Sequence, residues 1–312
     1  MHAIATLAAA LTVAGVLHAP AAGEQQRDSR PARVAITFDD LPVHAALPPG
    51  VTRAGIAART VEALQARRSP PVYGFVNAKG VEDEPDASSV LTIWRDAGFP
   101  LANHGFAHVD LHAATAEAFE RDITRNEPTL QSLMPHGGWR WFRYPFLNEG
   151  DTPAKGRRVA DFLAARGYRI APVTLNFDDW AYSAPYARCA AARDQAAIEW
   201  LKASYMRRAG QSLSRGRQAA RALFGRDIDH ILLLHIGAFT ALMLPDVLDL
   251  LGAHGFQLIT LDEAAADPAY RTTLPRPPSR SGTLLDQLMS GRNTPMPAWQ
   301  EEPLERLTTI CQ

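Results

Sequence analysis

Carboxylates and histidines follow apolar runs of this chain at spacings that suit metal-assisted hydrolysis. Asp39 and Asp40 end an early apolar run, and His104 and His108 follow a later one. Histidines four residues apart project to one side of a helical turn or a tight loop. Two histidines and one carboxylate, with open positions for water, form a hydrolytic metal site. We therefore expect one aspartate to be the third ligand and the other to be a general base toward water on the metal.

The metal that these ligands predict is a divalent cation. Zinc fits two imidazoles and a carboxylate best, and cobalt, nickel and iron are the alternatives. An HxxxH pair alone is a weak signal, because helices carry such pairs by accident. His112 continues the same spacing, and we interpret it as an exposed residue with a structural role.

Further polar residues follow other apolar runs. The segment 143–146 reads RYPF, the segment 176–180 reads NFDDW, and His235 ends a run of leucines. In α/β barrels and sheets, functional residues gather at the C-terminal ends of the strands. Titratable residues after five such runs therefore indicate one composite site.

The elements that must position these residues are seven β-like runs with helical stretches between them. The runs lie at residues 34–38, 71–76, 100–103, 139–144, 168–174, 230–234 and 256–261. Continuous apolar runs suit strands that are covered on both faces. Alternation of strands and helices predicts an α/β fold with a parallel sheet. Seven runs favour an incomplete barrel, and an open doubly wound sheet is the alternative.

The chain divides into four segments. We expect a signal peptide at 1–22, a linker at 23–32, an α/β domain at 33–268 with a helical insertion at 186–225, and a C-terminal tail at 269–312. The first segment is an apolar run too short to span a bilayer, followed by small residues that suit cleavage. It predicts an exported protein, periplasmic or secreted, with no membrane span in the mature form; an uncleaved anchor is the alternative.

Cysteine content and charge narrow the class of protein. Cys189 and Cys311 are the two cysteines, and in an oxidising compartment we expect them to form one disulfide. The formal net charge is -1, which argues against a nucleic-acid partner, because affinity for phosphates needs a basic field. We interpret the arginines at 207–208 and 215–217 as solvated helix faces.

Five motifs together resemble the polysaccharide deacetylases, also called the NodB-homology domain or carbohydrate esterase family 4. TFDD at 37–40 and HGFAH at 104–108 resemble the first two motifs of that family. RYPF at 143–146, Asp179-Trp180 and LLH at 233–235 resemble the third, fourth and fifth. All five occur in family order. The resemblance implies a distorted (β/α)7 barrel of the NodB type and makes 33–268 the catalytic domain.

The resemblance also implies a role for each matching residue. Asp39 would be the catalytic base, held in its charged form by Arg143, and His235 would be the acid, tuned by Asp179. The implied metal ligands are Asp40, His104 and His108. The residues implied at the oxyanion and the acetyl group are Pro145, Phe146, Trp180 and Leu233.

The implied activity is metal-dependent removal of N-acetyl groups from a carbohydrate such as peptidoglycan, a chitin-like oligomer or an exopolysaccharide. An O-acetyl esterase, another non-peptide C–N amidohydrolase or a glycan-binding pseudoenzyme are the alternatives. Three departures from the family pattern, Gly105, Leu147 and Ile236, predict a divergent branch with a reshaped cleft. The implied partner is an acetylated glycan.

Overall fold

The structure is a computed structural model that describes residues 31–274, 276–300 and 304–312. The expected signal peptide at 1–22 therefore lies outside the described residues. Within the part of the chain that is described, no helix is long and apolar enough to cross a membrane.

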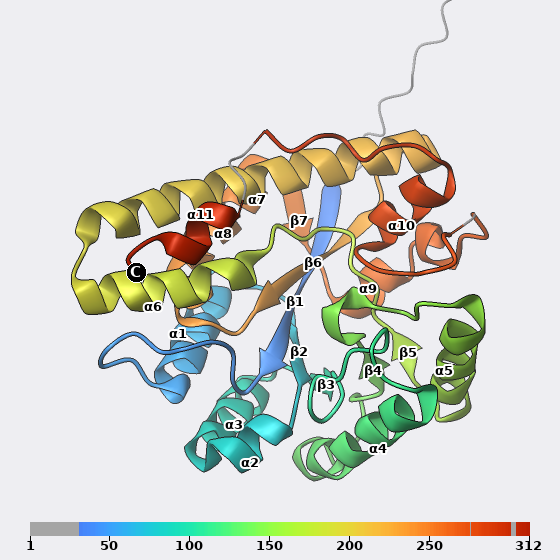
Figure 1. Ribbon diagram of the computed structural model, residues 1–312, viewed down its shortest axis with the longest axis horizontal. Coiled ribbons are helices and arrows are strands. Elements are labelled where there is room, and N and C mark those ends of the chain that lie inside the picture. Colours follow the sequence, from blue (N-terminus) through green and yellow to red (C-terminus); the bar gives the residue numbers. More distant parts are fainter. Residues whose placement is uncertain (1–30, 275, 301–303) are drawn as a thin grey trace, which may run out of the picture.

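Seven parallel strands form the centre of the molecule (Figure 1). They are β1 (Ala32–Leu41), β2 (Tyr73–Val76), β3 (Leu101–Asn103), β4 (Trp141–Phe142), β5 (Arg169–Ile170), β6 (Asp229–His235) and β7 (Phe256–Leu258). The strand order is β5-β4-β3-β2-β1-β6, and β7 pairs with the first residues of β1. All seven predicted runs contain a strand, although β2, β3, β4, β5 and β7 are shorter than predicted.

The sheet curls, and its two ends approach each other. Leu175, which follows β5, forms a parallel bridge with Leu232 of β6. The backbone N–H of Leu233 donates to the carbonyl of Leu175 at 3.0 Å. The distorted (β/α) barrel is therefore confirmed, in place of the open doubly wound sheet.

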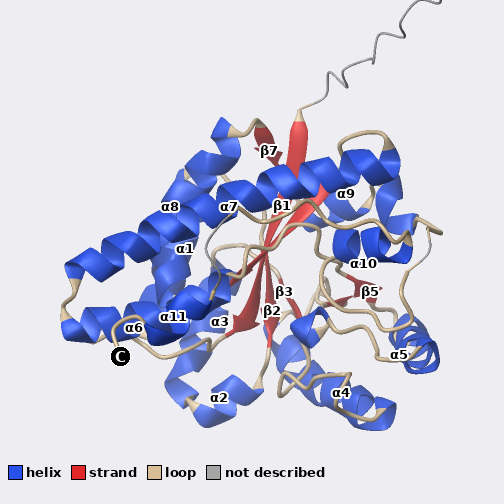
Figure 2. Ribbon diagram, turned by 45° about the horizontal axis from the view of Figure 1, so that its top comes forward, coloured by secondary structure: helices blue, strands red, loops and turns tan. Residues whose placement is uncertain are grey.

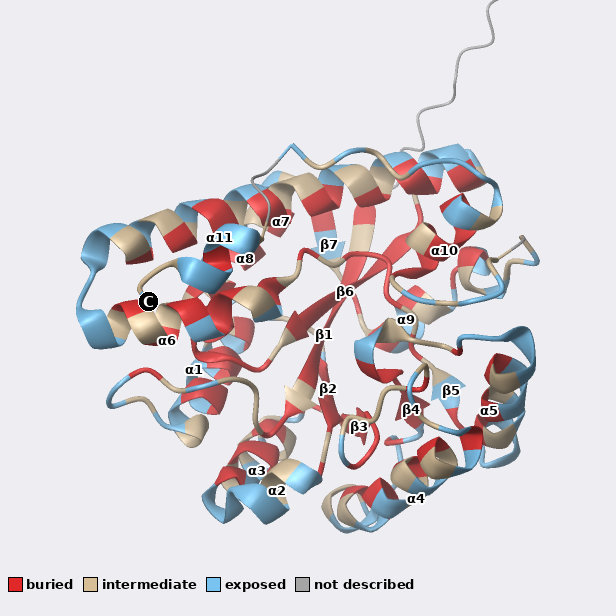
Figure 3. Cartoon of the chain, in the orientation of Figure 1, coloured by how far each residue is buried: buried red, intermediate tan, exposed pale blue. Residues whose placement is uncertain are grey.

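Helices surround this curled sheet (Figure 2). They are α1 (Arg53–Ala66), α2 (Lys79–Asp83), α3 (Ser88–Asp96), α4 (Ala116–Leu133), α5 (Pro153–Ala165), α6 (Ser183–Ala192), α7 (Gln195–Phe224), α8 (Ala238–Ala253), α9 (Leu261–Ala265), α10 (Leu284–Gly291) and α11 (Glu305–Thr309). Thr52, Thr115 and Thr152 cap α1, α4 and α5 by accepting a backbone N–H of the first turn. The helices bury apolar residues against the sheet, and their opposite faces are exposed (Figure 3).

The interior of the barrel is filled by every second residue of the strands. Ala35, Phe75, Trp141 and Ile231 belong to one buried cluster, which Leu261 of α9 also joins. Because alternate residues of a strand share a face, the next inward positions toward the carboxyl ends are Thr37 and Asp39, Arg143, and Leu233 and His235. The register pairs Asp39 with His235 directly. Strand alternation therefore delivers the polar residues to one end of an apolar interior.

The helical insertion consists of two helices, α6 and α7, with a break at Arg193–Asp194. The interpretation of its arginines as solvated is wrong for Arg208, which is buried and donates to the carbonyl of Phe177 at 3.0 Å. Its guanidinium and that of Arg215 stack on Trp299, at 4.3 and 4.0 Å from the ring. A long helix that crosses the barrel buries one face, and arginines on that face must find partners.

The C-terminal residues pack back onto the insertion. Residues of α10 share a buried cluster with α7, and Cys311 forms a disulfide with Cys189 of α6. The predicted disulfide is therefore confirmed. Between α9 and α10, Arg280 forms an antiparallel bridge with Gly150, which brings the following residues to the open end of the barrel.

Candidate metal and catalytic site

A cleft of about 380 Å³ opens at the carboxyl ends of the strands. Most of the predicted site residues line it: Asp39, Asp40, His104, His108, Phe146, Trp180, Leu233 and His235. The other predicted residues lie behind this lining. Arg143 and Asp179 are buried beneath it and contact Asp39 and His235, and Pro145 is buried next to Phe146.

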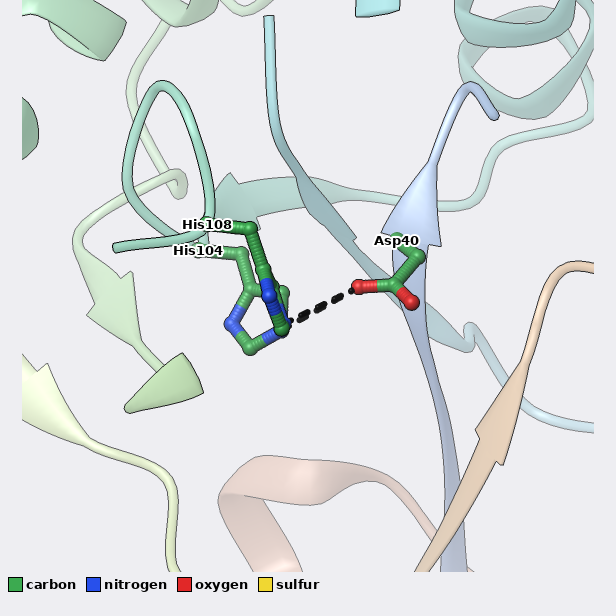
Figure 4. A group of neighbouring side chains, drawn as sticks. All are labelled: Asp40, His104 and His108. Carbon is green, nitrogen blue, oxygen red and sulfur yellow. Dashed lines mark ion pairs between the residues drawn. The ribbon is translucent and has the colours of Figure 1, made fainter. Parts of the chain in front are cut away.

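Asp40, His104 and His108 converge on one point (Figure 4). One ligand atom from each residue lies within 4.8 Å of the others. Nε2 of His104 and Nε2 of His108 lie 3.5 and 3.4 Å from Oδ1 of Asp40. That oxygen is buried and has no hydrogen-bond partner within the described residues. A buried carboxylate oxygen normally has a partner, so this donor set fits a divalent cation.

The loop that carries both histidines is held from two sides. The side-chain amide of Asn77 donates to the carbonyls of His104 and Gly105 at 2.7 and 2.9 Å. Gly105 has φ 75°, and a Cβ there would lie 2.5 Å from Oδ2 of Asp122. Glycine at position 105, one departure from the family pattern, thus meets both a backbone and a packing requirement.

The hydrogen bonds and protonation of the two histidines suit coordination of a cation through Nε2. Nδ1 of His104 donates to the carbonyl of Arg143 at 2.8 Å, which leaves Nε2 with the lone pair. Burial, followed by the charge of His104, lowers the pKa of His108 to about 4. Burial opposes ionisation of Asp40, but contacts with His104 and His44 hold the pKa of Asp40 well below its usual value. Metal binding needs these protonation states.

Asp39 also lines the cleft, where its Oδ2 lies 3.5 Å from Nε2 of His104, and it pairs in addition with Arg143. Nη1 of Arg143 lies 3.3 and 3.4 Å from its two oxygens. The fully buried guanidinium is itself fixed, because Nε donates to the carbonyl of Ala171 at 2.6 Å and Nη2 to Thr37 at 3.1 Å. Arg143 thereby places a positive charge beside Asp39 and limits its rotation.

His235 is paired with Asp179 on the other side of the cleft. Nδ1 of His235 lies 2.8 Å from Oδ1 of Asp179, whose Oδ2 accepts from the backbone N–H of His235 and the hydroxyl of Thr240. Burial disfavours the charged imidazolium, but Asp179 outweighs it and raises the pKa of His235 to about 9. The neighbouring Asp178 pairs with Arg208 instead.

The rim of the cleft is built from backbone in the left-handed region. Asp40, His108, Phe146, Leu147 and Asp178 all have φ between 53° and 64° and all line the cleft. Non-glycine residues with positive φ cluster where function demands an unusual side-chain direction. Leu147, one of the departures from the family pattern, has φ 55°, a backbone conformation that favours glycine.

Several residues of the cleft were not predicted. His44 and Tyr144 line it, as do Asn176, Ser281 and Gly282. His44 gave no signal because it lies in the loop after β1, and Ser281 and Gly282 gave none because they come from the C-terminal tail. His112 is half-buried, not exposed as predicted, because its Nε2 lies 3.0 Å from the carbonyl of Arg280.

The curled parallel sheet and the site at its carboxyl end define an α/β barrel of the NodB type. The chain resembles the polysaccharide deacetylases, whose family model, described as "Polysaccharide deacetylase", matches residues 26–171. The resemblance inferred from the five motifs is therefore confirmed. None of the curated proteins compared with the chain matches it.

Solved structures with the same fold belong to carbohydrate esterase family 4 and related deacetylases. A chitin deacetylase from the fungal pathogen Colletotrichum lindemuthianum is 19% identical, with a TM-score of 0.50 over 77% of this chain and 89% of the other. The polysaccharide deacetylase Bc1974 from Bacillus cereus is 15% identical, with 0.50 over 74% and 92%. A family 4 pseudoenzyme from Bacillus anthracis is 14% identical, with 0.50 over 75% and 66%. At these identities the likeness establishes the fold.

Proposed function

We propose that this chain is a metal-dependent deacetylase that hydrolyses N-acetyl groups of a carbohydrate. One observation carries the proposal, namely that three groups lie in one cleft. Asp39 is paired with the buried Arg143, and His235 is paired with the buried Asp179. Beside them, one aspartate and two histidines form a group that fits a cation. A base, an acid and a Lewis-acid site in one cleft are what amide hydrolysis requires.

Asp40, His104 and His108 would hold the metal, which we take to be zinc, with cobalt, nickel or iron as alternatives. When bound, the ion would act as a Lewis acid toward the acetyl group and the attacking water. Asp39 takes a proton from that water as its oxygen adds to the carbonyl carbon, and Arg143 keeps the carboxylate in place. The N–H of Phe146 is assigned to the developing oxyanion.

His235 completes the reaction on the leaving group. Its Nδ1 is occupied by Asp179, so Nε2 is the nitrogen that gives a proton to the sugar amine as the C–N bond breaks. A raised pKa keeps this acid protonated near neutral pH. Leu233 and Trp180 would wall the acetyl group, and the exposed rings of Phe146 and Trp180 would contact sugar faces.

The substrate class is an acetylated glycan: peptidoglycan, a chitin-like oligomer or an exopolysaccharide. The relevant support is the family resemblance and the open, aromatic-edged cleft. We further propose that the protein is exported, to the periplasm or the medium. The disulfide between Cys189 and Cys311 suits an oxidising compartment.

Acetate release from a panel of N-acetylated glycans tests the function. We expect release that stops after chelation and returns with zinc or cobalt. Replacement of Asp39 by Asn should lower kcat by about 10²- to 10⁴-fold while zinc still binds. O-acetylated xylan in the same panel separates an esterase from an amidase. Glycan binding without acetate release at any metal would instead establish a pseudoenzyme.

A further inference from the structure

His44 lies in the wall of the cleft, four residues after Asp40, and none of the motifs uses it. Its Nδ1 lies 2.8 Å from Oδ2 of Asp40. Its ring is 5.2 Å from the ring of His235, between centroids. Its carbonyl accepts from Nη1 of Arg53 at 2.9 Å, which ties the loop to α1. The imidazole is thus held between the metal ligand and the acid.

The hydrogen bond to Asp40 sets the tautomer of His44. An ionised carboxylate only accepts hydrogen bonds, so Nδ1 must carry the proton. Nε2, the other nitrogen, is buried and has no hydrogen-bond partner in the described part of the chain. Among the described residues, the hydrogen bond that the imidazole of His44 makes is therefore the one to Asp40.

The two oxygens of Asp40 consequently face different groups. Oδ2 accepts from His44, whereas Oδ1 faces Nε2 of His104 and Nε2 of His108. Asp40 is also in the left-handed region, with φ 64°, and lies within an irregularity in the pairing of β1 with β2. On such a backbone, a side-chain hydrogen bond determines which oxygen points to the histidines.

We propose that His44 is a positioning residue that fixes Asp40 as a one-oxygen ligand of the metal. Groups that hydrogen-bond a ligating carboxylate commonly contribute about 10- to 100-fold to metal affinity. Without His44, Oδ2 would turn toward the cation or toward water, and the carboxylate would lose its fixed orientation. The inference rests on the proposed metal site and needs no particular substrate.

Metal affinity of the full chain tests this role. The protein is stripped with a chelator and titrated with zinc alone, in competition with a chromophoric chelator. We expect His44→Ala to weaken binding about 10- to 100-fold. His44→Asn places an amide N–H near the position of Nδ1 and should restore most of the affinity. His44→Gln places its amide near Nε2 and should not.

Cobalt as the probe gives a second readout that a merely structural role would not change. Cobalt(II) in four-coordinate sites absorbs visible light more strongly than in sites of higher coordination. We expect the wild type and His44→Asn to share one spectrum. In His44→Ala, Asp40 can bind through both oxygens, so the absorption should weaken. His112→Ala, at a half-buried histidine outside the cleft, is the control and should match the wild type.

Unchanged zinc affinity and an unchanged cobalt spectrum in His44→Ala would overturn the proposal. The proposal would also be overturned if His44→Ala raised the KM for an N-acetylated glycan and left zinc affinity unchanged. His44 would then be a substrate contact through Nε2. If His44→Ala does not fold, the comparison of Asn with Gln at this position decides. Because these titrations contain no glycan, a chain that behaves as expected here but releases no acetate would contradict only the deacetylase function.

Discussion

At the scale of single residues, two adjacent aspartates are given different surroundings by the backbone. Alternate residues of a regular strand point to opposite faces, so Asp39 and Asp40 would not share a cleft. The pairing of β1 with β2 shifts between Phe38 and Leu41, and Asp40 has φ 64°. Because of this irregularity, both carboxylates point into the same cleft. The residues alone predicted the pair and left open which aspartate is the third ligand. Nε2 of His104 lies 3.5 Å from one oxygen of each aspartate, whereas Nε2 of His108 lies 3.4 Å from Asp40.

The Asp179–His235 pair predicts the alkaline side of the pH–rate profile. In the proposed reaction protonated His235 is the active form, so activity should be present below its pKa and fall as pH rises through about 9. In Asp179→Asn the raising charge is gone and burial dominates, so the fall should move to lower pH by about one unit or more. The profile of kcat against pH measures this.

Asp178→Asn is the matched control for that shift, since Asp178 pairs with Arg208 and not with His235. Whatever it does to the rate, the position of the alkaline fall should stay where it is in the wild type. An alkaline fall that does not move in Asp179→Asn would show that another group limits the reaction.

At the scale of elements, strands were easier to predict than the loops that follow them. Buried parallel strands are continuous apolar runs, so the sequence predicted all seven. β4 and β5 are shorter than their apolar runs because only two residues of each strand pair with the other. The break at Arg193–Asp194 is marked by neither glycine nor proline. Arg193 adopts the left-handed region there, and Asp194 caps α7. A charged residue in that conformation carries no clear sequence signal.

The loop 104–108 should tolerate no side chain at position 105. Gly105→Ala combines a left-handed φ with a clash against Asp122, which holds the N–H of Ala107 at 3.0 Å. We expect a loss of stability greater than the roughly 1–2 kcal/mol of the backbone conformation alone, together with weaker zinc binding. Thermal melts and zinc titrations measure the two effects.

Gly98→Ala provides the comparison, because Gly98 has φ 82° and nothing within 4 Å of the added Cβ. It should show the backbone cost alone, with zinc affinity intact. Equal losses for the two variants would mean that Asp122 moves aside freely.

The disulfide fastens the C-terminal segment to α6 across 122 residues of chain. Replacing Cys189 and Cys311 together by Ser should lower stability by about 2–4 kcal/mol, since the unfolded chain regains the freedom of that loop. Neither cysteine lines the cleft, so acetate release at moderate temperature should persist. Denaturant unfolding with and without reductant tests this, and a reduced wild type should match the double variant.

At the scale of the whole molecule, metal and fold should stabilise each other. The three proposed ligands come from β1 and from the loop after β3, so only the folded chain brings them together. Free zinc at 100 times its dissociation constant should raise the free energy of unfolding by about 2.7 kcal/mol. A zinc-dependent rise in Tm that disappears in His104→Ala is the expected result. A rise that survives that substitution would place the metal elsewhere.

The proposed site residues come from two stretches of chain. The bridge between Leu175 and Leu232 and the pairing of Asp39 with His235 bring these stretches together. The segment 26–171 contains the proposed base, its arginine and all three proposed metal ligands. The proposed acid, its aspartate and the cleft residues Ser281 and Gly282 come later in the chain. A graft of the first stretch onto a foreign scaffold would therefore transfer a cation site without a proton donor. A chimera of two related chains must therefore take both stretches from the same parent, and it must preserve the pairing of β1 with β6.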